Sequence, residues 1–148
     1  MLAESLKSLF TRDLNKLKTE IEAYKNEDII WKVDKNILNS AGNLCLHLVG
    51  NLNHFLGAIL GNSGYIRNRD LEFSLKNIPR AELIGQIEKT IEVVNSSLDN
   101  LSPDDLGKEF PVQALGYPMT TDYFLIHLIG HLEYHLGQIN YHRRLLDI

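Results

Sequence analysis

Residues 120–146 read TTDYFLIHLIGHLEYHLGQINYHRRLL, and their apolar side chains recur with the period of an α-helix. Successive members of the apolar stripe are three or four residues apart, with histidines at positions 135 and 142 completing it; the apolar members are Leu125, Leu128, Leu132, Ile139 and Leu146. Thr120, Thr121 and Asp122 are residue types that cap helix N-termini. The segment therefore predicts an amphipathic helix that carries histidines on its apolar face.

Three earlier segments show the same periodicity. They cover roughly residues 2–25, the region from Asn39-Ser40 to the turn-forming 61–64, and the region from about Arg80 to Leu101. Because isolated helices are marginal in water, such stripes must pack together, and one axis can bury all four. We therefore expect an all-α protein, a four-helix bundle with antiparallel-like helices, in a single domain over residues 1–148. The connections 26–39, 61–79 and 102–119 are long, and long loops are often functional.

Composition limits the classes of partner. The 148 residues include 15 basic and 19 acidic side chains, a net charge of −4, with no run of Lys and Arg of the kind that binds nucleic acid. The apolar segments fall far short of the ~20 residues that a membrane span requires. Cys45 is the one cysteine, which excludes an intrachain disulfide and fits a reducing compartment. We expect a cytoplasmic protein with neither nucleic acid nor membrane as a partner.

All six histidines fall in the second and fourth predicted helices. His131 and His135 are four residues apart, so they project from nearly the same helix face and can close on one metal ion. His47 lies beside the stripe of the second helix and is the best candidate for the third ligand. Three imidazoles that leave positions open for water are typical of catalytic rather than structural metal sites.

A metal-free polar network inside the bundle is the alternative interpretation. Two uncompensated imidazoles on an apolar stripe would cost free energy, which favours the metal. His127 lies one turn before His131, so we place it near the metal but not on it, with simple packing as its alternative.

The remaining histidines and two other side chains are expected outside the set of metal ligands. His54 and His142 are expected beside the ligands or on the surface. Glu133 does not complete the protease motif H-E-x-x-H, because Leu132 follows His131, and it is expected to be a solvated charge. Cys45 is expected to be a small core residue.

Two segments resemble a known family. His127-Leu-Ile-Gly-His131-Leu-Glu-Tyr-His135-Leu-Gly-Gln138-Ile is similar to the last helix of the DinB family of metal-binding four-helix bundles, in which two histidines four apart precede Gly-Gln-Ile. Residues 39–52, NSAGNLCLHLVGNL, and residues 67–73, RNRDLEF, resemble an uncharacterised DinB-like subfamily. The resemblance implies a metal triad of His47, His131 and His135, with His127 close to it.

The same resemblance implies a class of chemistry, because the superfamily includes thiol-dependent transferases. A divalent ion (zinc, nickel or iron) lowers the pKa of a bound water or thiol. We expect an enzyme that transfers a low-molecular-weight thiol to a small electrophilic substrate. A metal-dependent hydrolase and a non-catalytic module that binds a metal or a small molecule remain open.

Candidate substrate contacts lie in the predicted loops. Arg67 and Arg69 have the charge to bind an acidic thiol or substrate, and Tyr117 could form a pocket wall; structural ion pairing is the alternative for the arginines. A homodimer is also expected. The pairs Leu9-Phe10 and Leu83-Ile84 widen two apolar stripes beyond one core, although long loops could cover them instead.

Overall fold

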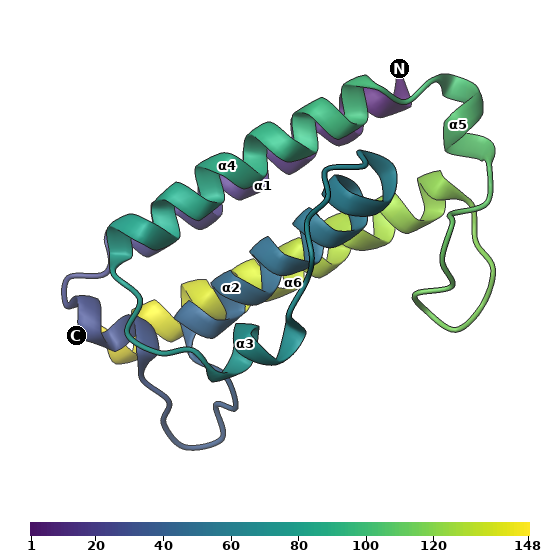
Figure 1. Cartoon of the computed structure of the whole chain (residues 1–148). Helices are drawn as coiled ribbons and strands as arrows, with labels where there is room; N and C mark the ends of the chain where they lie inside the picture. The colour runs from purple at the N-terminus through teal and green to yellow at the C-terminus, as the bar shows by residue number, and fades with distance from the viewer.

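The structure is a computed structural model that describes residues 1–148, and it is helical throughout (Figure 1). In chain order the elements are α1 (Leu2–Ala23), the 3-10 helix η1 (Glu27–Trp31), α2 (Ala41–Leu52), the π-helix η2 (Asn53–Leu60), α3 (Arg69–Ser74), α4 (Arg80–Asp99), α5 (Pro103–Gly107) and α6 (Thr121–Leu146). One isolated bridge, between Glu109 and Thr120, is the only strand-like pairing. The predicted all-α class is confirmed.

The four predicted helices correspond to α1, α2 with η2, α4 and α6. The three short helices in the connections were not predicted, because a helix of one or two turns shows too little of the apolar period. Ser102 shows how such a short helix starts, one residue after the predicted helix ends at Leu101. Its hydroxyl accepts a hydrogen bond from the Asp105 N–H at 3.1 Å and caps α5. The Asp105 carboxylate accepts in return from the Ser102 N–H at 2.9 Å, completing a capping box.

The long helices form two pairs, α1 with α4 and α2 with α6, which lie against each other (Figure 1). Within each pair the helices are antiparallel, as the ion pairs Lys7–Asp99 and Lys18–Glu88 show for α1 and α4. Between the pairs, however, neighbours are parallel. Arg12 contacts Glu133 and Glu20 contacts Arg143, which fixes the parallel direction of α1 and α6.

The parallel neighbours correct the antiparallel-like arrangement expected from the sequence. Asn53 of η2 donates to Thr90 of α4 at 2.9 Å, and the chain brings Gly57 against Val93 further along, so α2–η2 and α4 also run in one direction. The cause is the connection 61–79, which contains α3 and returns along the outside of the molecule before α4 starts (Figure 1).

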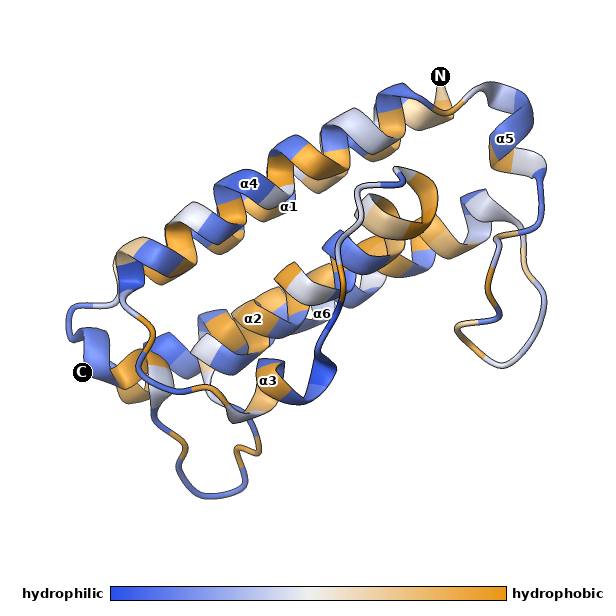
Figure 2. Ribbon diagram, in the orientation of Figure 1, coloured by the Kyte–Doolittle hydropathy of each residue, from blue (hydrophilic) through white to orange (hydrophobic).

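One cluster of 28 buried hydrophobic residues occupies the space between the helices. Along α1 and α4 apolar and polar residues alternate as in an amphipathic helix, whereas α2 is largely apolar (Figure 2). Every residue of α2 from Ala41 to Leu52 is buried, because α4, α6, η1 and α3 all contact this helix. Its predicted apolar stripe is therefore part of a wholly enclosed helix.

Two of the residues on which the predicted homodimer rested are internal. Phe10 and Leu83 are fully buried in the core of their own chain, and Ile84 is half-buried against it. The stripes are wide because each long helix contacts two neighbours. This basis for a homodimer is wrong, and the oligomeric state itself stays a prediction.

Crossing a lipid bilayer requires a length and apolarity that none of these helices combines.

Candidate metal centre

The three predicted ligands come together where α2 and α6 face each other. His47 on α2 and His131 on α6 bring their Nε2 atoms to 3.0 Å, and His135 completes the group with its ring centroid 5.2 Å from that of His47. One nitrogen from each residue lies within 4.8 Å of the others. Two nitrogens on one tetrahedral zinc ion are about 3.3 Å apart, given bonds of 2.0–2.1 Å. The three histidines are therefore close enough to bind one divalent metal.

On the α2 side, a buried carboxylate orients the His47 ring. The His47 Nδ1 lies 3.0 Å from Oε1 of Glu72, and Arg67 binds both oxygens of that carboxylate, with Nε at 2.8 Å and Nη2 at 2.9 Å. Burial alone would raise the pKa of Glu72, but the hydrogen bonds from His47 and Arg67 and the charge of Arg67 lower it overall. Glu72 is therefore ionised and accepts, so Nδ1 of His47 donates and Nε2 is the ring nitrogen that faces the centre.

The sequence of α2 explains how Glu72 reaches this position. Asn43, His47 and Gly50 are spaced four and three apart, so they share the helix face onto which α3 docks. Gly50 has no side chain where Oε2 of Glu72 lies, and a Cβ there would overlap that oxygen. The Asn43 amide donates to the carbonyls of Glu72 and Leu75 at 3.0 and 2.8 Å, which holds the end of α3 in place.

On the α6 side, the partners are fewer and neutral. Nδ1 of His135 lies 2.7 Å from Oε1 of Gln138, one turn further along the helix, so it donates and leaves Nε2 with a lone pair. Burial lowers the pKa of His135. Burial, together with the neighbouring histidines and Arg67, lowers the pKa of His131 to about 3. Both imidazoles are therefore neutral near pH 7, which is the form that ligates metals.

One polar atom of the centre has no partner within the chain. The Nδ1 of His131 is buried without a hydrogen bond. An unpaired buried polar group costs about 1–3 kcal/mol, and such groups in native proteins call for a specific explanation. The nitrogens that converge belong to three imidazoles and lie within 4.8 Å of one another, and such a donor set fits a divalent cation. The residues present thus fit the metal that the sequence predicts.

The other predicted histidines separate into different environments. His127 is exposed and stacks at 6.5 Å, between ring centroids, on His131, so it lies beside the triad as predicted but outside it. His54 is half-buried and packs on Phe55. His142 was expected beside the ligands or on the surface. That expectation is wrong, because His142 is buried and contacts none of the three ligands.

A second, self-contained network holds His142. Its Nδ1 lies 2.7 Å from the Tyr24 hydroxyl, and its Nε2 donates to the Lys32 carbonyl at 2.8 Å. Both ring nitrogens are therefore satisfied by the chain itself. Through these two hydrogen bonds His142 links α6 to the residue that ends α1 and to the segment after η1.

The predicted substrate contacts are not all brought to the triad. Arg67 is drawn inward by Glu72, so the ion-pairing alternative describes it. Arg69 is exposed, with its guanidinium 5.2 Å from the Phe73 ring centroid, and the Tyr117 hydroxyl is exposed and contacts the Tyr123 hydroxyl at 3.1 Å. No role in substrate binding is evident for these two residues from their contacts.

Two minor assignments have clear outcomes. Glu133 is half-exposed, but it also accepts a hydrogen bond from Arg12 at 2.8 Å, so it links α6 to α1. Cys45 is buried, and burial raises the pKa of its thiol to about 12. The prediction of a small core residue is confirmed, and Cys45 is not a thiolate near neutral pH.

The sequence patterns did not predict the roles of Glu72 and Gln138 beside the triad. Asn68 followed by the acidic residues Asp70 and Glu72 is a helix-start signal, and it could have revealed α3, whose N-terminus Asn68 caps. No local signal tells which carboxylate in a loop will be buried against His47. The i, i+3 spacing of His135 and Gln138 could have identified their contact.

Comparison with known families places the chain as a whole. A family model described as "Protein of unknown function (DUF1572)" matches residues 3–147. The chain belongs to this family. No curated protein matches the sequence. In this DUF1572 chain the match runs from α1 through α6, so the triad, Glu72 and Arg67 all lie inside the matched region.

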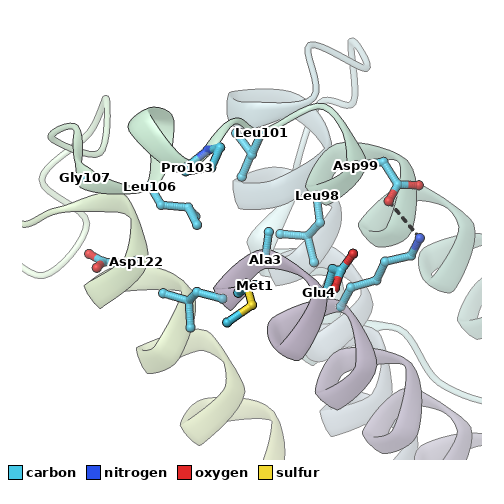
Figure 3. A pocket seen from close by; sticks show the side chains of 12 residues that line it. Met1, Ala3, Glu4, Leu98, Asp99, Leu101, Pro103, Leu106, Gly107 and Asp122 are labelled. Carbon is cyan, nitrogen blue, oxygen red and sulfur yellow. Dashed lines mark hydrogen bonds and ion pairs between the residues drawn. The ribbon is translucent and has the colours of Figure 1, made fainter.

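Cavities of similar size lie at opposite ends of the molecule. The cavity in Figure 3, of about 650 Å³, lies where the starts of α1 and α5 meet the end of α4, and it contains no histidine. Its wall includes the Lys7–Asp99 ion pair and also Glu4 and Asp122. A second cavity, of about 520 Å³, is lined by His135 and Gln138 and therefore adjoins the triad.

Proposed function

We propose that this chain is a metal-dependent enzyme with a DinB-like four-helix bundle and one divalent ion on His47, His131 and His135. The observation that carries the proposal is the convergence of the three imidazoles, two of which are held by outer partners through Nδ1. Imidazole ligands are compatible with zinc, nickel or iron. Three protein ligands leave coordination positions open, as catalytic metal sites do.

A divalent ion in this position supplies one kind of chemistry, since it lowers the pKa of a water or thiol that it holds and yields a nucleophile near neutral pH. We propose transfer of a low-molecular-weight thiol to a small electrophile, and the support for this choice is the resemblance to the DinB family. The chain's own residues contribute orientation, since Glu72 holds the His47 ring and Gln138 holds the His135 ring.

Hydrolysis requires the same ligands, and a non-catalytic binding module requires only the ion. No contact of the described residues favours either over thiol transfer. Arg67 is bound by the Glu72 carboxylate through Nε and Nη2, so its charge is already paired within the chain. The reaction must therefore be separated by assay.

The metal is tested first, on protein purified without nickel resin. We expect one divalent ion per chain by elemental analysis, and none in the double variant His131→Ala/His135→Ala. His127→Ala on the same helix is the matched control and should keep the ion, because His127 is exposed beside the triad. Equal metal content in wild type and the double variant would overturn the site.

The reaction is tested next, with the zinc-loaded chain. Consumption of a thiol such as glutathione or cysteine in the presence of 1-chloro-2,4-dinitrobenzene should depend on zinc and be lost in the double variant. Zinc-dependent cleavage of a nitrophenyl ester without a thiol would assign hydrolysis instead. Zinc binding with neither activity across a broad panel would favour a binding module.

A further inference from the structure

The cavity beside the triad has the position and size of a small-molecule site. It lies between residues 36–39 and the second half of α6, and its volume of about 520 Å³ falls within the usual range for ligand pockets. His135 lines the cavity and also belongs to the triad: Gln138 holds its Nδ1, and its ring centroid lies 4.6 Å from that of His131 and 5.2 Å from that of His47. A molecule in this cavity therefore contacts a residue of the metal centre.

The wall of this cavity carries no charged side chain. None of its lining residues is Lys, Arg, Asp or Glu, in contrast to the cavity of Figure 3, which has four such residues. Burying an ion without an opposite charge is costly, so a charged occupant is disfavoured here. Apolar contact comes from leucine and isoleucine side chains, and hydrogen-bonding capacity from Tyr134, Tyr141, Asn36 and Asn39.

The imidazoles in the wall do not supply a charge or a free proton either. His142 uses Nδ1 for the Tyr24 hydroxyl and Nε2 for the Lys32 carbonyl, so it presents its ring carbons. Recognition is therefore left to hydroxyl and amide groups and to apolar surface. Leu145 and Tyr141 at the rim are exposed, and an occupant that covers them removes apolar area from water.

We propose that this cavity binds a neutral small molecule, with an apolar or aromatic body and hydrogen-bonding groups, as the substrate of the metal centre. The cavity's role as a substrate site rests on the function proposed above, whereas binding of a neutral ligand does not. The electrophile, rather than a carboxylate-bearing thiol, is the molecule that matches these walls. This differs from the arginine-based contacts predicted from sequence.

Binding is tested with three probes of one shape: benzamide, benzoate and benzylamine. In NMR spectra of the ¹⁵N-labelled chain, benzamide should shift the backbone amides of residues 36–39 and 138–145. Benzoate and benzylamine, both charged near pH 7, should bind at least about tenfold more weakly, because each would bury an unpaired charge. Equal affinity for the three probes, or shifts at Leu98 and Leu106 instead, would overturn the proposal.

A matched pair of variants fixes the location. Leu145→Trp narrows this cavity at its rim, and Leu2→Trp does the same in the cavity of Figure 3. The first should reduce benzamide affinity at least about tenfold and the second should leave it unchanged, since the two leucines lie in different cavities. The reverse result, or equal effects, would contradict the assignment.

Zinc titration of the same samples separates the two proposals. Benzamide binding by a chain that takes up no zinc would leave the cavity in place and overturn the metal enzyme. Zinc uptake with no preference for the neutral probe would leave the metal site in place and overturn the assignment of the cavity.

Discussion

The two helices that supply the triad hold their histidines in different ways. On α2, which is enclosed along its whole length, His47 is fixed by a buried carboxylate that Arg67 binds through two nitrogens. On α6, His135 is fixed by the exposed, neutral Gln138, and His131 has a buried nitrogen with no partner. The α2 side is thus preorganised by charge and burial, whereas on the α6 side only His135 has an orienting partner, and that partner is exposed and neutral.

The largest expected effect comes from removing the carboxylate on the α2 side. Glu72→Ala should weaken zinc binding about 10–100-fold, the range for outer partners of metal ligands, because His47 loses its orienting acceptor. Gln138→Ala should cost less than about tenfold, since water can replace an exposed neutral acceptor. Competition with a chromogenic chelator measures both affinities.

Glu72→Gln serves as the control for folding, because it keeps the volume and one acceptor oxygen. Circular dichroism should show the wild-type helix content, and zinc affinity should fall between wild type and Glu72→Ala. If Gln138→Ala weakens zinc binding as much as Glu72→Ala, the difference between the two sides does not exist.

Substitution of one glycine on α2 and one on α6 compares how closely the two helices are packed. Gly50→Ala on α2 places a methyl group on Oε2 of Glu72, and we expect a loss of about 1–3 kcal/mol in unfolding free energy together with weaker zinc binding. Gly137→Ala on α6 meets no atom within 4 Å, and it should stabilise the chain by about 0.5–1 kcal/mol because alanine favours the helix. Urea unfolding measures both, and equal signs would contradict the model of a closely packed α2 and an open α6.

The smallest expected effect is the contribution of His142, further along α6, to the pH dependence of the unfolding free energy. Burial lowers its pKa below the 6.5 of an unperturbed histidine, with a further contribution from the Lys32 charge, although the hydrogen bond to the Lys32 carbonyl acts in the opposite direction. Between the folded and unfolded pKa values the unfolded chain binds more protons, so stability is complete above about pH 6.5 and falls as the pH drops through the folded value.

His142→Asn removes this titration while keeping one hydrogen-bonding group. In metal-free protein, the advantage of the wild type over the variant should decrease as the pH falls below about 6.5, with a slope of at most about 1.4 kcal/mol per pH unit for one proton. His131 and His135 are present in both chains, so their contributions cancel. Parallel curves of unfolding free energy against pH would show that His142 does not titrate in this range.

Local sequence patterns predicted the four long helices and the proximity of His131 and His135 in the candidate site. The spacing of Leu125, Leu128 and Leu132 is a property of one helix turn, so no other part of the chain is needed to read it. The same holds for His131 and His135, whose proximity follows from an i, i+4 separation. The long connections could not be read in this way, because α3 and α5 are too short to show a full apolar period.

Only the tertiary structure decided which helices and side chains contact each of these helix faces. Whether the Phe10 and Leu83 stripes face a partner or their own core depends on how many helices surround them, and sequence periodicity does not contain that number. The directions of α2 and α4 depend on the path of the connection between them. The pairing of His47 with His131, 84 residues away, and with Glu72, 25 residues away, exists only once the chain has folded. Hydrogen bonds and electrostatic contacts act over a few ångströms in space, whereas a sequence pattern reports neighbours along a single helix.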